Sequence, residues 1–444
     1  MRKLLIFLII SSVLKPCAAQ KTWTLQECID YALANNITLQ QNRVTSAQNQ
    51  VDINSAKGQW LPNVNFSTNH NVGYRPFSQS TINLTNGTMT TTSRETNYNG
   101  NYGINASWTV WNGGRREKNI QKNEMAKQLA DLQTDQSANT IQQQIAQLYV
   151  QILYEYEAVK VDSEIVKFSK LQRDRAQEMM NVGNLARVDV AQLEAQVTQD
   201  EYSLVSAQLQ LENYKLQLKQ LLEIHTDEAF NVAIPDVLEP SVLAPVPDKN
   251  AVYQYALGIR PEIQSGKLNI DASKLDEKIA KAGYLPTVTM SASMGSSNSS
   301  GIHTNIGTQL KNNWSNTLGL TLSVPIFDQK QTRNQVARAK LSTLSNELQL
   351  KNTEKQLYTE IENYWLQATA AQQQYLSAKT NVKSMKESYD LVSEQFNLGL
   401  KNIVELTTGK NNLLAAQQQL LQSKYTALYN LSMLRFYEGQ NIKL

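Results

Sequence analysis

Residues 315–327 read S-N-T-L-G-L-T-L-S-V-P-I-F and alternate between two kinds of side chain. The odd positions from Ser315 to Pro325 are small or polar, whereas the even positions are apolar from Leu318 to Ile326. A period of two is typical of a strand whose two faces meet different surroundings. The stretch has no charge and is longer than the roughly 9 to 11 residues that a tilted strand needs to cross a bilayer. It predicts a membrane strand, and a strand of a soluble sandwich is the alternative.

Three further stretches alternate in the same way, and the four together favour the membrane. We expect strands at about residues 62–74, 96–111, 286–297 and 314–327. Their wet faces carry Asn, Ser, Thr and Gly, where a soluble sandwich would carry Lys and Glu. Aromatic residues toward the strand ends fit an interfacial belt: Tyr74, Tyr98, Trp108, Trp111 and Trp314. The positions expected to face lipid are Val64, Phe66, Ile104, Trp108, Leu318, Leu320, Leu322 and Val324.

The first 19 residues read as a secretory signal peptide, with a basic start, an apolar run and small residues before cleavage after Ala19. Its removal takes away three basic residues and lowers the formal charge from +3 to zero. No overall basic charge then remains to attract nucleic acid. Cys17 is a possible lipid attachment site, but Lys15 and Pro16 stand where small residues would be expected. Cys28 has no second cysteine in the mature chain, which excludes a disulfide scaffold.

The mature chain reads as a duplicated unit. The segment Y-A-L at residues 31–33 recurs at 255–257, and A-K-G-Q-W-L-P at 56–62 recurs as A-K-A-G-Y-L-P at 280–286. Each copy is expected to contain helix, strand, loop, strand, long helix, glycine turn and helix. We expect the first copy at residues 20–222, an irregular proline-rich connector at 223–249, the second copy at 250–436 and a tail at 437–444.

Long helices are expected at residues 115–181, 187–222, 331–397 and 402–436, since no proline interrupts sequence rich in Gln, Ala, Leu, Lys and Glu. Apolar residues recur every seven positions from Val190 to Leu218, which predicts supercoiled packing. Gly183 and Gly399 end the ascending helices, where a turn residue with positive φ is expected. Each copy therefore predicts one long helical hairpin.

The sequence contains none of the usual motifs of an enzyme. His70, His225 and His303 stand alone, without the spacing of metal ligands. A phosphate loop, a nucleophile elbow and a dinucleotide fingerprint are also missing from the sequence. We therefore predict a protein that is not an enzyme and that uses no cofactor.

The chain resembles the TolC-like outer-membrane efflux proteins over nearly all of its mature length. The resemblance lies in the order and duplication of the Y-A-L segments, the L-P entries into strands, the W-N-G-G-R exit at residues 111–115, and the two glycine turns followed by V-D-V and V-E-L. It implies a homotrimer in which each chain gives four strands to a twelve-stranded membrane barrel. A coiled-coil barrel of long helices would continue that barrel into the periplasm.

The resemblance also implies a constriction at the periplasmic tip, with acids just after the glycines. By distance from the glycines, the acids fall on Asp189, Glu405 and Thr408, the basic partner on Lys401, and a locking tyrosine on Phe396. Lys401 is expected to pair with Asp189 of a neighbouring subunit. Capping of the returning helices is the alternative role for the two acids.

The implied function is a passive exit duct in the cell outer membrane. Small molecules would reach it from an inner-membrane transporter and a periplasmic adaptor. The adaptor would dock near Gly183 and Gly399. A type I protein-secretion duct of the same architecture and a soluble periplasmic coiled-coil scaffold are the alternatives.

Overall fold

The computed structural model describes residues 22–443, except for residues 75, 77–80, 86–87, 93–95, 226–229, 237 and 303. The expected signal peptide with Cys17, and His303, lie outside the described residues. The chain forms two compact units: the first contains Met1–Val44, Asp131–Gly266 and Leu350–Leu444, and the second contains Thr45–Ala130 and Lys267–Gln349. Each unit combines segments of both sequence repeats, so the units do not follow the repeat boundaries.

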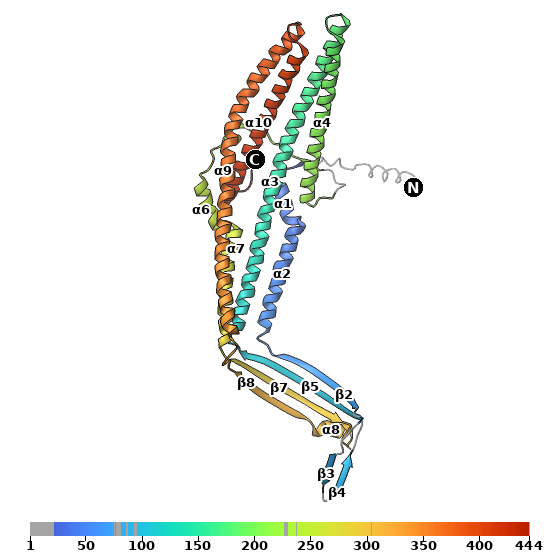
Figure 1. Cartoon of the computed structure of the whole chain (residues 1–444), viewed down its shortest axis with the longest axis vertical. Helices are drawn as coiled ribbons and strands as arrows, with labels where there is room; N and C mark the ends of the chain where they lie inside the picture. The colour runs from blue at the N-terminus through green and yellow to red at the C-terminus, as the bar shows by residue number, and fades with distance from the viewer. Residues whose placement is uncertain are drawn as a thin grey trace, which may run out of the picture. The chain divides into compact units, whose positions relative to one another are not determined.

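The second unit contains an antiparallel four-stranded sheet (Figure 1). Its strands are β2 (Asn63–Tyr74), β5 (Thr96–Trp111), β7 (Thr287–Ser299) and β8 (Ser315–Ser323), in the order β2-β5-β7-β8. The central pair, β5 and β7, joins the two repeats. Strands β2 and β8 form the two edges of the sheet.

The strand register places the apolar residues on one face. Directly opposite residues of antiparallel strands share a face. One such row joins Phe66, Ile104 and Met294, and another joins Trp108, Met290 and Leu320. A neighbouring row on the other face contains only Asn, Ser and Thr, namely Asn65, Asn105, Ser293 and Thr317. The alternation predicted strand by strand therefore becomes one apolar and one polar face.

The structure corrects the sequence prediction at the end of one strand and in two loops between strands. β8 ends at Ser323 instead of 327, because Pro325 has no N–H to donate to a neighbouring strand. The first loop, expected at residues 75–95, contains a hairpin of β3 (Thr81–Thr85) and β4 (Thr88–Thr92). The second loop contains α8 (Ile306–Asn312), which begins where Asn305 accepts a hydrogen bond from the Thr308 backbone N–H at 2.7 Å.

Helices make up most of the first unit. The long ones are α3 (Arg115–Asn181), α4 (Arg187–Leu221), α9 (Gln331–Asn397) and α10 (Ile403–Tyr437); the shorter ones are α1 (Leu25–Asn35), α2 (Ile37–Gly58), α6 (Lys249–Ile259) and α7 (Pro261–Lys281). Helices α2, α3, α7 and α9 continue into the second unit. Among the described helices, none is both long and apolar enough to cross a membrane.

The core of the first unit follows the seven-residue period. On α4, Val190, Val197, Leu211 and Leu218 are all buried. On α3, Ile145 and Ile152 are fully buried against side chains of α1, α4 and α10. Replacing such a leucine or isoleucine by alanine typically lowers the free energy of unfolding by about 2 to 5 kcal/mol. The apolar stripe of α3 thus anchors the helical hairpins.

The connector and the tail are more ordered than the sequence predicted. β1 (Thr22–Trp23) pairs in parallel with β6 (Asn231–Val232), and α5 (Glu239–Val242) follows in the connector. The Gln372 side-chain amide donates hydrogen bonds to the backbone carbonyls of Val242 and Ala244. In the tail, Ile442 is buried. Both segments therefore belong to the packed first unit.

Candidate functional site

The two helical hairpins end in the same kind of turn. Gly183, between α3 and α4, has a φ of +84°, and Gly399, between α9 and α10, has a φ of +73°. The next residue bonds back across each turn: the Asn184 N–H donates to the Met179 carbonyl at 2.8 Å, and the Leu400 N–H to the Gln395 carbonyl at 2.9 Å. These bonds satisfy carbonyls that the helix end leaves free. The positive φ predicted for both glycines is confirmed.

The tips carry exposed apolar side chains. A Cβ at either glycine would meet nothing within 4 Å, so the backbone conformation explains the glycines better than a close contact does. Beside them, Val182 is 71% exposed and Leu398 is 73% exposed. Exposed apolar groups of this kind mark interaction surfaces when they cluster.

An apolar cluster lies behind the tips and joins all four helices of the hairpins. Phe396 of α9 belongs to this cluster and is only 2% exposed. Around it pack Ala176 of α3, Val190 and Leu193 of α4, Tyr389 of α9, and Ile403, Leu406 and Leu413 of α10. The position that the resemblance assigned to a locking tyrosine is therefore a buried core residue of its own chain.

Glu405 caps helix α10. Its backbone N–H donates to the Asn402 side-chain oxygen at 3.0 Å, and its carboxylate accepts from the Asn402 backbone N–H at 3.2 Å. The Lys401 ammonium also donates to this carboxylate. That bond, together with the Asn402 N–H, lowers the pKa of Glu405 below its usual value. Lys401 thus pairs with Glu405 of its own chain, and its pairing with Asp189 of a neighbouring subunit stays a prediction.

Asp189 occupies the matching position of the other hairpin, six residues after its glycine. It is half-buried in the first turn of α4, and the N-cap Ala186 makes no side-chain hydrogen bond there. A carboxylate in a first turn is stabilised by the helix dipole. Thr408 is exposed and supplies no acid. Each hairpin therefore brings one acid to the start of its returning helix.

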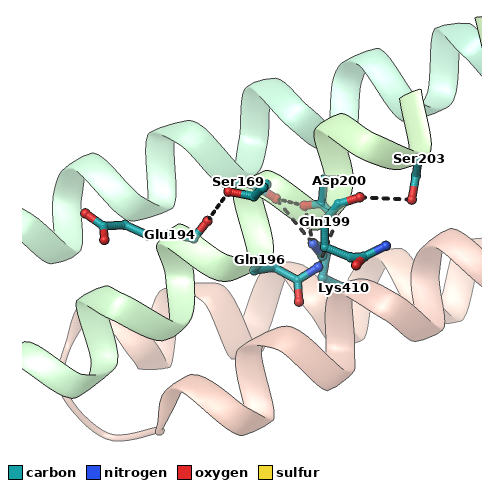
Figure 2. Close-up of polar contacts among 8 residues, drawn as sticks. Ser169, Glu194, Gln196, Gln199, Asp200, Ser203 and Lys410 are labelled. Carbon is teal, nitrogen blue, oxygen red and sulfur yellow. Dashed lines mark hydrogen bonds and ion pairs between the residues drawn. The ribbon is translucent and has the colours of Figure 1, made fainter. Parts of the chain in front are cut away.

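Sequence reasoning missed a buried polar cluster that joins three helices (Figure 2). Lys410 of α10 forms an ion pair with Asp200 of α4, at 2.5 Å between Nζ and Oδ2. The Ser169 hydroxyl of α3 donates to the same carboxylate, and the Lys410 ammonium donates to the hydroxyl at 3.3 Å. Gln196 donates to the other carboxylate oxygen at 2.8 Å. Burial lowers the pKa of Lys410, while Asp200 opposes that shift.

A serine beside a lysine can act as a nucleophile in some enzymes. Here Ser169, Asp200 and Lys410 are each 6% exposed or less. A substrate carbonyl therefore has no route to the hydroxyl, and the cluster is a structural contact. Its signal in the sequence was the break in the seven-residue period, with Asp200 seven residues after Leu193 and Lys410 seven after Ile403.

The apolar face of the sheet is a second candidate surface, in the second unit. Phe66 is 67% exposed, Leu318 is 70% exposed and Leu320 is 72% exposed. Val64, Ile104, Leu322 and Val324 are also exposed, whereas Trp108 is half-buried and donates to the Trp60 carbonyl at 2.9 Å. An apolar face of this size needs an apolar covering.

The sequence matches one family model over most of its length. The model is that of the outer membrane efflux protein, and it matches residues 28–223 and 252–440. The outer membrane efflux protein BepC of Brucella suis is 22% identical over 356 residues, which cover 79% of this chain and 74% of that protein. The outer membrane protein TolC of Escherichia coli is 27% identical over 267 residues, which cover 58% of this chain and 53% of TolC.

Solved structures share the fold. The outer membrane protein VceC of Vibrio cholerae superposes with a TM-score of 0.76 at 16% identity, covering 94% of this chain and 97% of that one. CusC superposes with the same TM-score at 14% identity, covering 93% of this chain and 91% of that one. Both repeats and both glycine turns lie within the family match. The chain therefore belongs to the outer membrane efflux protein family, the TolC-like channels of the outer membrane.

Proposed function

We propose that three copies of this chain form the outer-membrane exit duct of a tripartite efflux system. The observation that carries the proposal is the four-stranded sheet, which has one exposed apolar face and two open edges. A passive duct needs neither a catalytic group nor a cofactor. It needs a wall against lipid and a wet interior.

The open edges support assembly from several copies. Backbone N–H and C=O groups at the edges β2 and β8 would lack partners in hydrocarbon, and each such group would cost several kcal/mol. Joining the β2 edge of one copy to the β8 edge of the next removes all edges. Three sheets of four strands would give a twelve-stranded barrel. Family membership supports the number three.

The polar face of the sheet would then line the duct. It carries uncharged Asn, Ser and Thr in register across the sheet. The opposite face would contact outer-membrane lipid. The helices would continue the duct into the periplasm.

The helical tips would form the periplasmic entrance and the docking surface for an adaptor. Gly183 and Gly399 shape the turns, and Val182, Leu398 and Leu400 expose apolar side chains beside them. Asp189 and Glu405 of each copy would gather near the entrance and attract cations. The adaptor would connect the duct to an inner-membrane transporter.

Secretion of a protein is the second candidate function. One relative, the alkaline protease secretion protein AprF of Pseudomonas aeruginosa, is 20% identical over 303 residues. Another is named toxin and drug export protein A and is 23% identical over 291 residues. Relatives with this fold are named for efflux and for secretion, so the phenotype of a deletion must decide between the two functions.

Deletion of the gene tests the proposal. We expect lower tolerance to toxic small molecules with unchanged secreted proteins, and loss of a secreted protein with unchanged tolerance would support the alternative. In a complementation assay, the Leu398→Asp variant should assemble in the outer membrane but should not restore tolerance, because its charge disrupts the apolar tip. Leu398→Met, which keeps an apolar side chain there, should restore it. Retention of the protein in the soluble periplasmic fraction would contradict both functions.

A further inference from the structure

The buried cluster of Ser169, Asp200 and Lys410 ties together α3, α4 and α10, and the buried apolar residues of α4 and α10 recur every seven positions. We infer that these three side chains fix the axial register of α3, α4 and α10, and thereby the relative level of the two hairpin tips. The inference deepens the proposed function and rests on it, since the aligned tips are those of the proposed duct.

The apolar packing does not select one register by itself. The buried row of α4 repeats every seven residues through Val190 and Val197, and that of α10 repeats through Leu406 and Leu413. A slide that brings Val197 to the place of Val190, or Leu413 to the place of Leu406, would replace apolar side chains by apolar side chains. Heptad packing tolerates such slips unless a polar residue specifies the register.

A slip of seven residues would disrupt the polar cluster. In its row on α10, the residues seven before and seven after Lys410 are Ile403 and Gln417. Sliding α10 either way would leave the Asp200 carboxylate buried without its ammonium partner. An unpaired buried charge is strongly unfavourable. The native register is therefore favoured over its nearest alternatives on α10.

Sliding α4 or α3 by seven residues would also disrupt the polar cluster. On α4, the residues seven before and after Asp200 are Leu193 and Ala207, which would leave Lys410 unpaired. On α3, sliding would replace Ser169 by Asp162 or Ala176. Asp162 would put a second carboxylate against Asp200. Burial, and to a smaller extent the charge of Asp200, already raises the pKa of Asp162. Two like charges in one buried site oppose that register.

The depth of the cluster separates it from the ion pair next to it in sequence. Lys170 and Glu201 also join α3 to α4, at 2.7 Å, but their side chains are 48% and 46% exposed. Water and salt screen such a pair, and it contributes little. This exposed pair provides a matched control.

A slip of one heptad would have a measurable consequence. Seven residues at 1.5 Å per residue displace one helix by about 10 Å along its axis. Val182 and Leu398, beside the two glycines, are exposed, so a cysteine at either position would be accessible to a spin label. The distance between labels at these positions reports the register of the hairpins within one chain.

The experiment uses full-length protein in a Cys28→Ala background, with labelled chains diluted into unlabelled chains. Double electron–electron resonance should give one narrow distribution of distances between spin labels on the Val182→Cys/Leu398→Cys variant. Adding Ser169→Ala, Asp200→Leu and Lys410→Leu should broaden the distribution or add a population displaced by up to about 10 Å. The triple substitution keeps an apolar core, so it should still fold. The swap of Asp200→Lys with Lys410→Asp should restore the narrow distance, and Lys170→Ala with Glu201→Ala should leave it unchanged.

A narrow distance at the native position in the folded triple variant would overturn the inference. So would equal broadening in the exposed-pair control. Neither result bears on transport, because the measurement needs no conductance. Failure of wild-type protein to conduct would instead overturn the proposed function and leave the register result standing.

Discussion

Replacing Leu320 by arginine would put a charge on the apolar face of β8. Leu320 is 72% exposed and shares its row with Met290 and Trp108. An arginine on the lipid face near the bilayer midplane costs about 2 to 4 kcal/mol per copy. Since 1.4 kcal/mol corresponds to a tenfold change in an equilibrium constant, insertion should weaken by about 30-fold to 700-fold per copy.

The matched control is Thr321→Arg on the neighbouring position of the same strand. Thr321 lies in a row with Thr289 and Thr109, on the polar face. Its arginine would meet water in the duct, so assembly should remain close to wild type. The assay is the amount of heat-modifiable protein in the outer-membrane fraction, followed by its urea midpoint. Equal loss of assembly in both variants, or in neither, would refute the assignment of the faces.

Other predictions concern the helical hairpins. Asp189→Asn with Glu405→Gln should reduce cation selectivity in planar bilayers, and a reversal potential equal to wild type would mean that the two acids only cap helices. Lys401→Ala should raise conductance. It should also raise the pKa of Glu405 toward its usual 4.5. A carboxylate with a lowered pKa contributes stability that is present above its usual pKa and is lost as the pH falls through the lowered one. The variant should therefore have a lower unfolding temperature at neutral pH and a smaller further drop on acidification below pH 4.5. Gly183→Ala should cost about 1 to 2 kcal/mol through its positive φ, measured as a lower unfolding midpoint. Lys410→Met should cost about 3 to 5 kcal/mol because it leaves a buried carboxylate unpaired, and an unchanged midpoint would contradict the burial of the pair.

The strands were predictable because their signal is local. A period of two is visible within one stretch, as at Leu318, Leu320 and Leu322, and the register then added the rows across the sheet. The end of β8 was less predictable. The apolar alternation continues through Val324 and Ile326, but Pro325 stops the hydrogen bonding, and Ile326 is 96% exposed.

The hairpin tips were predictable from Gly183 and Gly399, since few other residues adopt their φ. The contact of Lys401 with Glu405 was not predicted; it forms because the Asn402–Glu405 capping box holds that carboxylate one helical turn from the lysine. The buried cluster was missed for a different reason. Single charged residues on a helix are usually solvated, and the spacing of Lys410 seven residues after Ile403 is a weak signal until the packing of three distant segments shows that Lys410 is buried.

The number of chains in the conducting species tests the central claim most directly. The protein is extracted from outer membrane, its native mass is measured, and the same preparation is recorded in planar bilayers. We predict that the conducting species contains three chains and that monomers give no channels, because a four-stranded sheet has open edges. A monomer that inserts stably and conducts would contradict the account.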